Sequence, residues 1–479
     1  MIDIVESLPK AQKAGLCVYL VHKGASLSQA NGADAATAKA DGFSGKKESS
    51  FYLPTGRRLY LGLGKAKETT LESYRRAGLA AARRARDLKV EAATLALPTG
   101  AAKDQAAAVA EGAWLGLYKY EEAKGKPAEP KEGKAAELKT LALLGAPAGS
   151  AAAIAEKRAV AEAVILVRDL VNRAPGEKIP MKYAADVAKL AKGLPGLTLK
   201  VLDKKAIQAW PMAGLAAINQ GSHNPPAFVH LHYKPVGAKA RKRVALVGKG
   251  VTFDSGGLSL KPAGSMLDMK CDMAGSATVI SLALLAAKLK LPVEVHACAP
   301  ITENMPGGDA IKIGDIIRYK NGKTAEMLNT DAEGRVILAD GLLYAESLQP
   351  DVILDFATLT GAAIVALGMG ISAVLGDDKL CQKFVALGAR SGESFWQLPL
   401  PGDYRKHIES KVADIKNIGN SGEAGTMAGA FYLKEFVSTE SWVHFDIAGP
   451  AFLKAEDGVN PAGGTGIPLR TVWEYLKGL

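Results

Sequence analysis

Short runs of nearly continuous apolar residues recur along the chain and alternate with longer segments of helical periodicity. In the first third, the pattern predicts strands near 15–22, 59–63 and 140–145 and helices at 70–88 and 106–115. Further apolar runs follow later in the chain, at 197–202, 228–233, 244–248, 293–299, 352–356, 371–375 and 443–447. Strands that alternate with helices predict an α/β protein, and strands without polar positions indicate a sheet covered on both faces.

The order of these elements predicts two domains of unequal size. Residues 1–147 are expected to form a small α/β domain, and an alanine-rich stretch within 148–172 is expected to form one connecting helix. Residues 173–479 are then left for a larger domain. A segment rich in Lys, Glu, Pro and Gly, residues 123–137, has nothing apolar to bury and predicts an exposed loop.

Composition narrows the class of protein. The 479 residues are 48% hydrophobic and 23% charged, as in ordinary globular enzymes. The first residues carry no basic and apolar leader, and the longest apolar stretch, 275–287, is too short to span a bilayer, so we expect a buried helix there and no membrane partner. The four cysteines form no CxxC pair. Reduced thiols in a cytoplasmic protein are therefore expected.

The net charge of +11 is concentrated partly on one predicted helix. That helix carries Arg75, Arg76, Arg83, Arg84 and Arg86. Such a cluster can follow the phosphates of DNA, but more often it is a solvated helix face. Because no aromatic ladder or nucleic-acid motif accompanies it, we expect a solvated face and keep DNA binding as an alternative.

The most informative short segment is NTDAEGR, which spans residues 329–335. Asp331, Glu333 and Arg335 alternate with small residues, and in an extended backbone alternate side chains share one face. Two carboxylates held that close repel each other unless a cation or a proton lies between them. The simpler interpretation is an acidic turn before a helix that begins near Val336.

A second segment, residues 247–278, favours the metal interpretation. It places Lys249 after an apolar strand and Asp272 before an apolar helix, with Asp254 and Lys261 between glycines. Charged groups at the ends of buried elements are typical of sites on α/β sheets. The carboxylates of Asp254, Asp272, Asp331 and Glu333 suit a pair of divalent cations. The sequence therefore predicts a two-metal hydrolase.

These segments resemble the signature of the leucyl aminopeptidases, the cytosol aminopeptidase family. The resemblance includes VGKGVTFDSGG from Val247, KCDMAGSA around Asp272, NTDAEGR, DFATLTGA at Asp355 and HFDIAG at His444. It is close over roughly residues 160–479 and loose in the first third. It implies a larger domain built on a mixed sheet sandwiched by helices, and a homohexamer.

The resemblance also implies roles for individual residues. The metal ligands would be Lys249, Asp254, Asp272, Asp331 and Glu333, holding two divalent ions such as manganese or zinc. Lys261 would polarise the scissile carbonyl, and Arg335 would hold bicarbonate as the general base on a metal-bridging water. The substrate would be a peptide with a free amino terminus, preferably leucine-like. Its pocket would be lined by Met269, Asn329, Thr358 and Ala448.

Two alternatives stay open at this point. The oxygen ligands alone do not exclude a two-metal phosphoester hydrolase, and the arginine-rich helix leaves DNA binding as a second alternative. The sequence contains none of three other catalytic motifs: it has no P-loop, no GxSxG and no HExxH. His230 and His232 share one strand face, where we expect a satisfied sheet pair rather than metal ligands.

Overall fold

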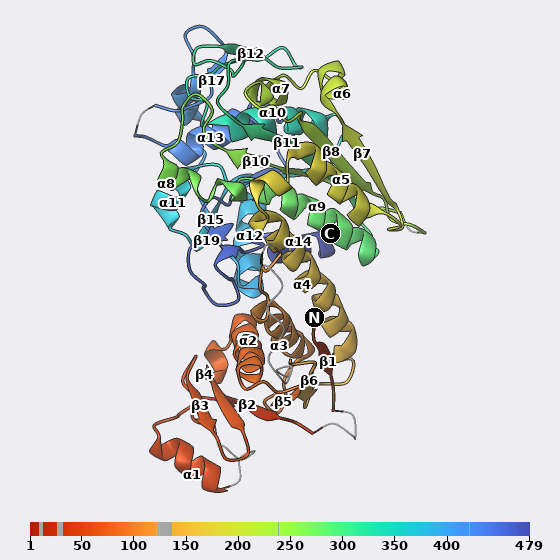
Figure 1. The fold of residues 1–479 in the computed structure, drawn as a ribbon, viewed down its shortest axis with the longest axis vertical. Helices are drawn as coiled ribbons and strands as arrows, with labels where there is room; N and C mark the ends of the chain where they lie inside the picture. The colour runs from red at the N-terminus through yellow and green to blue at the C-terminus, as the bar shows by residue number, and fades with distance from the viewer. Residues whose placement is uncertain (9–12, 26–31, 123, 125–136, 238, 421) are drawn as a thin grey trace. The chain divides into compact units, whose positions relative to one another are not determined.

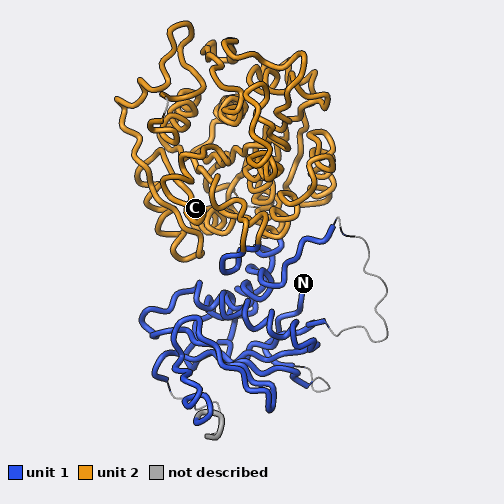
Figure 2. The backbone as a smooth tube through the Cα atoms, turned by 60° about the vertical axis from the view of Figure 1, so that its left-hand side comes forward, with its two compact units in different colours: residues 1–162, 456–461 blue, residues 163–455, 462–479 orange. Residues whose placement is uncertain are grey.

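The computed structural model describes residues 1–8, 13–25, 32–122, 124, 137–237, 239–420 and 422–479. The chain divides into two compact units, shown in Figure 2. Unit 1 contains residues 1–162 and 456–461, and unit 2 contains residues 163–455 and 462–479. The boundary lies inside helix α4 (Ser150–Asn172), and the short segment 456–461, placed in the larger domain by the sequence interpretation, groups with unit 1.

Unit 1 is an α/β domain, as predicted. Its six-stranded sheet has the order β1-β6-β5-β2-β4-β3 and is parallel except at the β3–β4 pair. The strands are β1 (Asp3–Val5), β2 (Leu16–His22), β3 (Ser50–Leu53), β4 (Arg58–Gly64), β5 (Ala92–Ala96) and β6 (Thr140–Leu144). The helices are α1 (Gly32–Ala40), α2 (Leu71–Asp87), α3 (Lys103–Gly116) and the first part of α4. Most of the predicted loop 123–137 lies outside the described residues.

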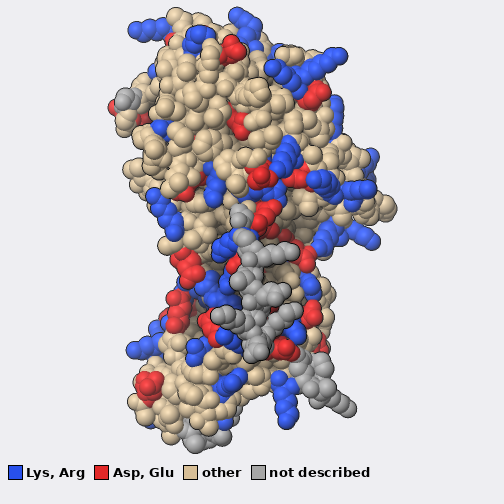
Figure 3. Space-filling view, viewed as in Figure 1, with Lys and Arg blue, Asp and Glu red and all other residues tan. Residues whose placement is uncertain are grey.

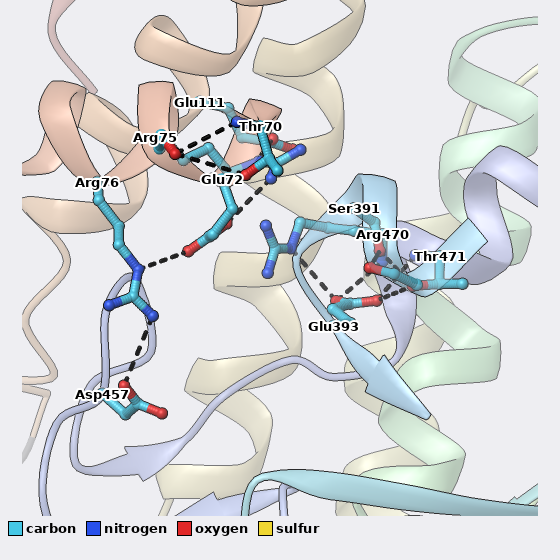
Figure 4. Close-up of polar contacts among 12 residues, drawn as sticks. Thr70, Glu72, Arg75, Arg76, Glu111, Ser391, Glu393, Asp457, Arg470 and Thr471 are labelled. Carbon is cyan, nitrogen blue, oxygen red and sulfur yellow. Dashed lines mark hydrogen bonds and ion pairs between the residues drawn. The ribbon is translucent and has the colours of Figure 1, made fainter. Parts of the chain in front are cut away.

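The prediction that the arginines of α2 form a solvated face is wrong for Arg75 and holds only in part for the other four. Arg75 is only 1% exposed and forms ion pairs with Glu72 and Glu111 (Figure 4). Arg76 pairs with Glu48, Glu72 and Asp457. The remaining three are half-buried, and each has its own partner: Arg83 pairs with Glu456, Arg86 with Asp87, and Arg84 lies 4.1 Å over the ring of Tyr52.

Unit 2 is built on a nine-stranded mixed sheet, again as expected. Its order is β16-β15-β18-β14-β9-β11-β8-β7, with β10 added beside β11. The strands are β7 (Leu197–Leu202), β8 (Ala227–Tyr233), β9 (Arg243–Gly248), β10 (Gly250–Asp254), β11 (Glu294–Asn304), β14 (Val352–Ala357), β15 (Ile371–Gly376), β16 (Ser394–Gln397) and β18 (Trp442–Asp446). The central strands β11, β9, β14 and β18 are parallel, so their carboxyl ends meet at one edge of the sheet.

Helices pack on the sheet of unit 2 (Figure 1). The main ones are α5 (Pro180–Ala191), α7 (Ala213–Asn219), α9 (Ala274–Lys288), α10 (Glu333–Glu346), α11 (Gly361–Leu367), α12 (Asp378–Ser391), α13 (Gly425–Lys434) and α14 (Leu469–Lys477). Residues 263–288 are long and apolar enough to cross a membrane, but 89% of the qualifying window is buried inside the fold. This confirms the prediction of a buried helix at 275–287.

The NTDAEGR segment is not extended, contrary to the sequence argument. Asp331 lies in a turn, and Glu333 is already the first residue of α10. On a helix, residues two apart point to different sides, so Glu333 and Arg335 do not share a face through strand alternation. Their convergence with Asp331 has to come from the tertiary structure.

Candidate functional site

A cavity of about 970 Å³ opens at the carboxyl edge of the unit 2 sheet. The metal-ligand, catalytic and substrate-pocket residues predicted from the sequence all line this cavity, with the exception of Glu333. Lys249, Asp254 and Thr358 follow or end the strands β9, β10 and β14, whereas Asp272 and Arg335 lie near the amino ends of α9 and α10. This is the place where open α/β sheets usually carry their ligand sites.

Lys249 lines the cavity and lies between two carboxylates. Its Nζ is 2.8 Å from Asp272 Oδ1 and 2.8 Å from Glu333 Oε1, and it donates a hydrogen bond of 3.0 Å to the carbonyl oxygen of Thr358. A Cβ at Gly334 would lie only 2.6 Å from Lys249 Nζ. Glycine is therefore needed at 334 for the lysine to reach the start of α10.

Lys261 joins the second pair of carboxylates. Its Nζ is 2.9 Å from Asp254 Oδ2 and forms a short ion pair with Asp331. Asp254 is also held by a 2.8 Å hydrogen bond from Asn304 and by the backbone N–H of Gly256. Asp331 is oriented by its own N–H, which donates to the Asn329 side chain.

The donor set fits divalent cations. Ligand oxygens of Asp254, Asp272 and Glu333 lie within 4.8 Å of one another, and all three side chains are buried. Asp272 Oδ2 is buried and has no hydrogen-bond partner among the described residues. A buried carboxylate oxygen without a partner is costly, so a cation at this position would satisfy it. Hard oxygen ligands suit manganese, magnesium or zinc.

The pKa values of the charged groups in the cavity reflect the short distances between its carboxylates and lysines. Burial raises the pKa of Asp272 well above its usual value, and the neighbouring carboxylates Glu333 and Asp254 add to the rise. Burial alone would lower the pKa of Lys249, but Asp272 and Glu333 outweigh it and raise the pKa. The pKa of Lys261 is likewise raised, because Asp254 and Asp331 outweigh the effect of burial. Lys261 is therefore an ammonium at neutral pH.

Arg335 is the third basic residue of the site, after Lys249 and Lys261. It is 7% exposed, and its Nε has no hydrogen-bond partner among the described residues. Burial lowers the pKa of the guanidinium, although it stays charged at any physiological pH. A buried guanidinium nitrogen without an acceptor beside a cavity suits a planar anion.

Several residues that support the site were not predicted from the sequence. Thr358 was predicted only as a pocket residue, but its hydroxyl donates a hydrogen bond of 2.7 Å to Asp272 Oδ1. Asn304 donates to Asp254, and Asn417 accepts from the backbone of Leu328 and donates to that of Asn329. Asp446 accepts from Thr360 and from the N–H of Ala448. The sequence signal that could have identified Asn304 and Asp446 is that each is a polar residue at the end of an apolar strand, β11 and β18 respectively.

The fold and this cavity define a two-unit α/β protein with an acidic site of the kind that holds cations. Residues 165–473 match the catalytic domain of the cytosol aminopeptidase family, and residues 20–127 match its N-terminal domain. The chain belongs to the cytosol aminopeptidase family.

Individual relatives and solved structures agree with this assignment. The chain is 42% identical over 447 residues to the "Probable cytosol aminopeptidase" of Thermosynechococcus vestitus, covering 91% of this chain and 89% of the relative. It is 44% identical over 444 residues to the protein of the same name in Chlorobaculum tepidum, covering 88% and 86%.

Two solved structures share the fold over nearly the whole chain. The bottromycin maturation enzyme BotP in complex with Mn has a TM-score of 0.87 and 37% identity, covering 97% of this chain and 99% of BotP. A mutant of tomato leucine aminopeptidase has a TM-score of 0.88 and 31% identity, covering 100% and 97%. The protein is thus an aminopeptidase-family enzyme of metal-dependent type.

Proposed function

We propose that this protein removes amino-terminal residues from peptides with a pair of divalent cations in the unit 2 cavity. The observation that carries the proposal is that ligand oxygens of Asp254, Asp272 and Glu333 converge at the cavity that Lys261 and Arg335 line. Family membership supports the aminopeptidase reaction, and the charges in the cavity suit it.

Five predicted side chains would supply the ligands of the two cations. Lys249, Asp254, Asp272, Asp331 and Glu333 would hold the ions. When bound, the cations would supply Lewis acidity, an anchor for the free α-amine of the substrate and a bridging water whose pKa falls from about 15.7 toward neutrality. An internal peptide has no free amine, so the reaction would be limited to chain ends. Lys249 must be neutral to act as a ligand, so the bound cations would have to lower the pKa that Asp272 and Glu333 raise in their absence.

Lys261 and Arg335 would act on the substrate and on the proton. The Lys261 ammonium would face the carbonyl oxygen of the scissile bond and stabilise the negative charge that develops there. Arg335 would hold a planar anion such as bicarbonate, which accepts the proton of the attacking water. The role of Lys261 uses positive charge that the neighbouring carboxylates of Asp254 and Asp331 keep in place.

The finer features of the proposal concern the substrate and the assembly. Met269, Asn329, Thr358 and Ala448 line the cavity, and its apolar wall continues through Leu359, Ile364 and Val365, which supports a leucine-like first residue. Manganese or zinc would be the metal, since one neighbouring structure is a Mn complex. We further propose a homohexamer acting in the cytoplasm, by likeness to the family.

A direct assay separates this proposal from a two-metal phosphoester hydrolase. The protein is incubated with manganese and either leucine p-nitroanilide or p-nitrophenyl phosphate. Release of nitroaniline without release of nitrophenol is expected, and a substrate panel with leucine, methionine, lysine and glutamate at the first position then measures the preference. Turnover of the phosphate ester alone would overturn the proposed reaction.

A further inference from the structure

Far from the cavity, the described residues contain a second group of side chains with metal-binding chemistry. His232 on β8 and Glu294 and His296 on β11 each offer one ligand atom, and these atoms lie within 4.8 Å of one another. His296 and His232 are direct partners in the antiparallel β11–β8 ladder. Glu294 and His296 are two residues apart on β11 and therefore share a sheet face.

This group lies at the opposite end of β11 from the cavity, because Glu294 is the first residue of that strand. Asn304, the last residue of β11, donates to Asp254 in the cavity. Eight residues of strand separate His296 from Asn304, which is about 26 Å at roughly 3.3 Å per residue. The two groups of ligands are therefore separate sites.

The hydrogen bonds around His296 leave one of its nitrogens facing the carboxylate. Its Nδ1 is 3.0 Å from His230 Nε2, and His230 Nδ1 is 3.1 Å from the Tyr344 hydroxyl oxygen. The other ring nitrogen, His296 Nε2, lies 3.3 Å from Glu294 Oε1, and His232 Nε2 is hydrogen-bonded to the same oxygen at 2.8 Å. His296 is 5% exposed, and its Nε2 has no hydrogen-bond partner among the residues that the structure describes.

The local chemistry suits a borderline transition metal. Histidines that bind metals usually donate their second ring N–H to a neighbour, as His296 would to His230. Two imidazoles and one carboxylate are ligands that favour zinc, nickel or copper.

We infer that His232, Glu294 and His296 form a second metal site, which takes one Zn²⁺-like ion per chain. In a tetrahedral zinc site, with bonds of about 2.0–2.1 Å, neighbouring ligand atoms lie about 3.3 Å apart. His232 Nε2 and His296 Nε2 lie 2.8 and 3.3 Å from Glu294 Oε1. The rings of His232 and His296 stack at 4.2 Å, so binding turns them out of the stack. The His232 side chain is 31% exposed and has room to turn.

One neighbouring charge opposes the ion and provides a sharp test. Arg243 Nε is 3.3 Å from Glu294 Oε2, so its guanidinium competes for the carboxylate. Arg243→Gln removes this competition and should tighten zinc binding. His232→Gln and Glu294→Gln remove a ligand each and should abolish it. His223→Gln is the matched control, because His223 is an exposed histidine outside the group.

The experiment measures zinc per chain by elemental analysis after equilibrium dialysis of the holoenzyme against buffered free zinc. The parent and His223→Gln should each retain about one equivalent more than His232→Gln and Glu294→Gln. All four proteins should hydrolyse leucine p-nitroanilide at the same rate, because the group is remote from the cavity. Equal zinc in the parent and both ligand variants, or an equal loss in His223→Gln, would overturn the inference.

Discussion

Two regions of this protein gather charged side chains, and they do so in opposite ways. On α2 of unit 1, the arginines are matched: Arg75 pairs with Glu72 and Glu111, and Arg83 pairs with Glu456. In the cavity of unit 2, carboxylates outnumber the lysines that contact them, and Asp272 Oδ2 has no hydrogen-bond partner among the described residues. Both regions contain several charged residues in the sequence.

The difference separates a structural cluster from a binding site. Burying a charge is tolerated when a partner and hydrogen bonds compensate it, and such a cluster requires no ligand. A cluster that stays unbalanced, as in the cavity, is stable only if something else supplies the missing charge. The imbalance therefore carries more functional information than the number of charges.

Removing one carboxylate from the unbalanced cluster should have the largest effect. Glu333→Ala deletes a proposed ligand and should abolish hydrolysis of leucine p-nitroanilide and reduce the bound metal, because no other side chain replaces the oxygen. Glu346→Ala, at the end of the same helix, is the control and should keep full activity. Normal turnover and metal content in Glu333→Ala would remove the cavity from the mechanism.

Breaking the balanced cluster should affect stability instead. Arg75→Met leaves Glu111 buried without its arginine and should lower the free energy of unfolding by about 3–5 kcal/mol, measured by urea denaturation. The double variant Arg75→Met/Glu111→Leu should recover much of this loss, since both charges are then gone. If the double variant is as unstable as the single one, then packing rather than charge balance is the cause.

Lys261 tests which charge in the cavity acts on the transition state. Lys261→Ala should lower kcat by roughly 10²–10³ while the metal content stays normal, which corresponds to about 2.7–4 kcal/mol of lost stabilisation. Lys320→Ala, which removes a lysine that packs on Trp210, serves as the control. A change confined to KM would show that Lys261 only binds the substrate.

The gathering of the predicted residues at one cavity was largely predictable because the proposed ligands lie in two short segments. Lys249 and Asp272 adjoin an apolar strand and an apolar helix, which fixes where they end up in the fold. Asn304 and Asp446 were missed because their roles depend on contacts with residues 50 and 86 positions away. The start of α10 at Glu333 was missed because Ala332, its N-cap, has no capping side chain.

The arginine cluster is a second case in which the sequence predicted the element but not its long-range contacts. The periodicity of α2 was visible, but the partner of Arg75 is Glu111, 36 residues away on an alanine-rich helix. A sequence pattern gives the face of a helix, whereas the partner that neutralises a charge is set by packing. The grouping of residues 456–461 with unit 1 depends in the same way on long-range contacts.

Asp340 on α10 sharpens the comparison, because it is buried outside the cavity lining and its Oδ1 also has no partner within the described chain. Burial raises the pKa of Asp340 to about 8, so the group is neutral at pH 7 and leaves no charge unbalanced. Between pH 4 and 8 the folded state holds more protons than the unfolded state, so stability falls as pH rises and levels off above about 8. Asp340→Asn should lack this contribution.

Urea unfolding of the parent and of Asp340→Asn at pH 5, 6.5 and 8, at one manganese concentration, measures this contribution. The stability of the parent relative to the variant should decrease across the series. A constant difference would mean that Asp340 is ionised throughout, and an unpaired buried charge would then exist without a ligand.

The smallest effect is expected where the charges are already matched. Basic and acidic side chains are interspersed on the face shown in Figure 3, and Arg83 and Arg86 each have an acidic partner. The variant Arg83→Gln/Arg84→Gln/Arg86→Gln should therefore leave the salt dependence of retention on a DNA column unchanged. If these arginines bound phosphates, the slope against log salt would fall by about 1 for each arginine–phosphate pair that the substitutions remove. A fall of that size would show that the arginines of α2 exchange their acidic partners for DNA phosphates. Charge balance alone would then not distinguish a structural cluster from a binding site.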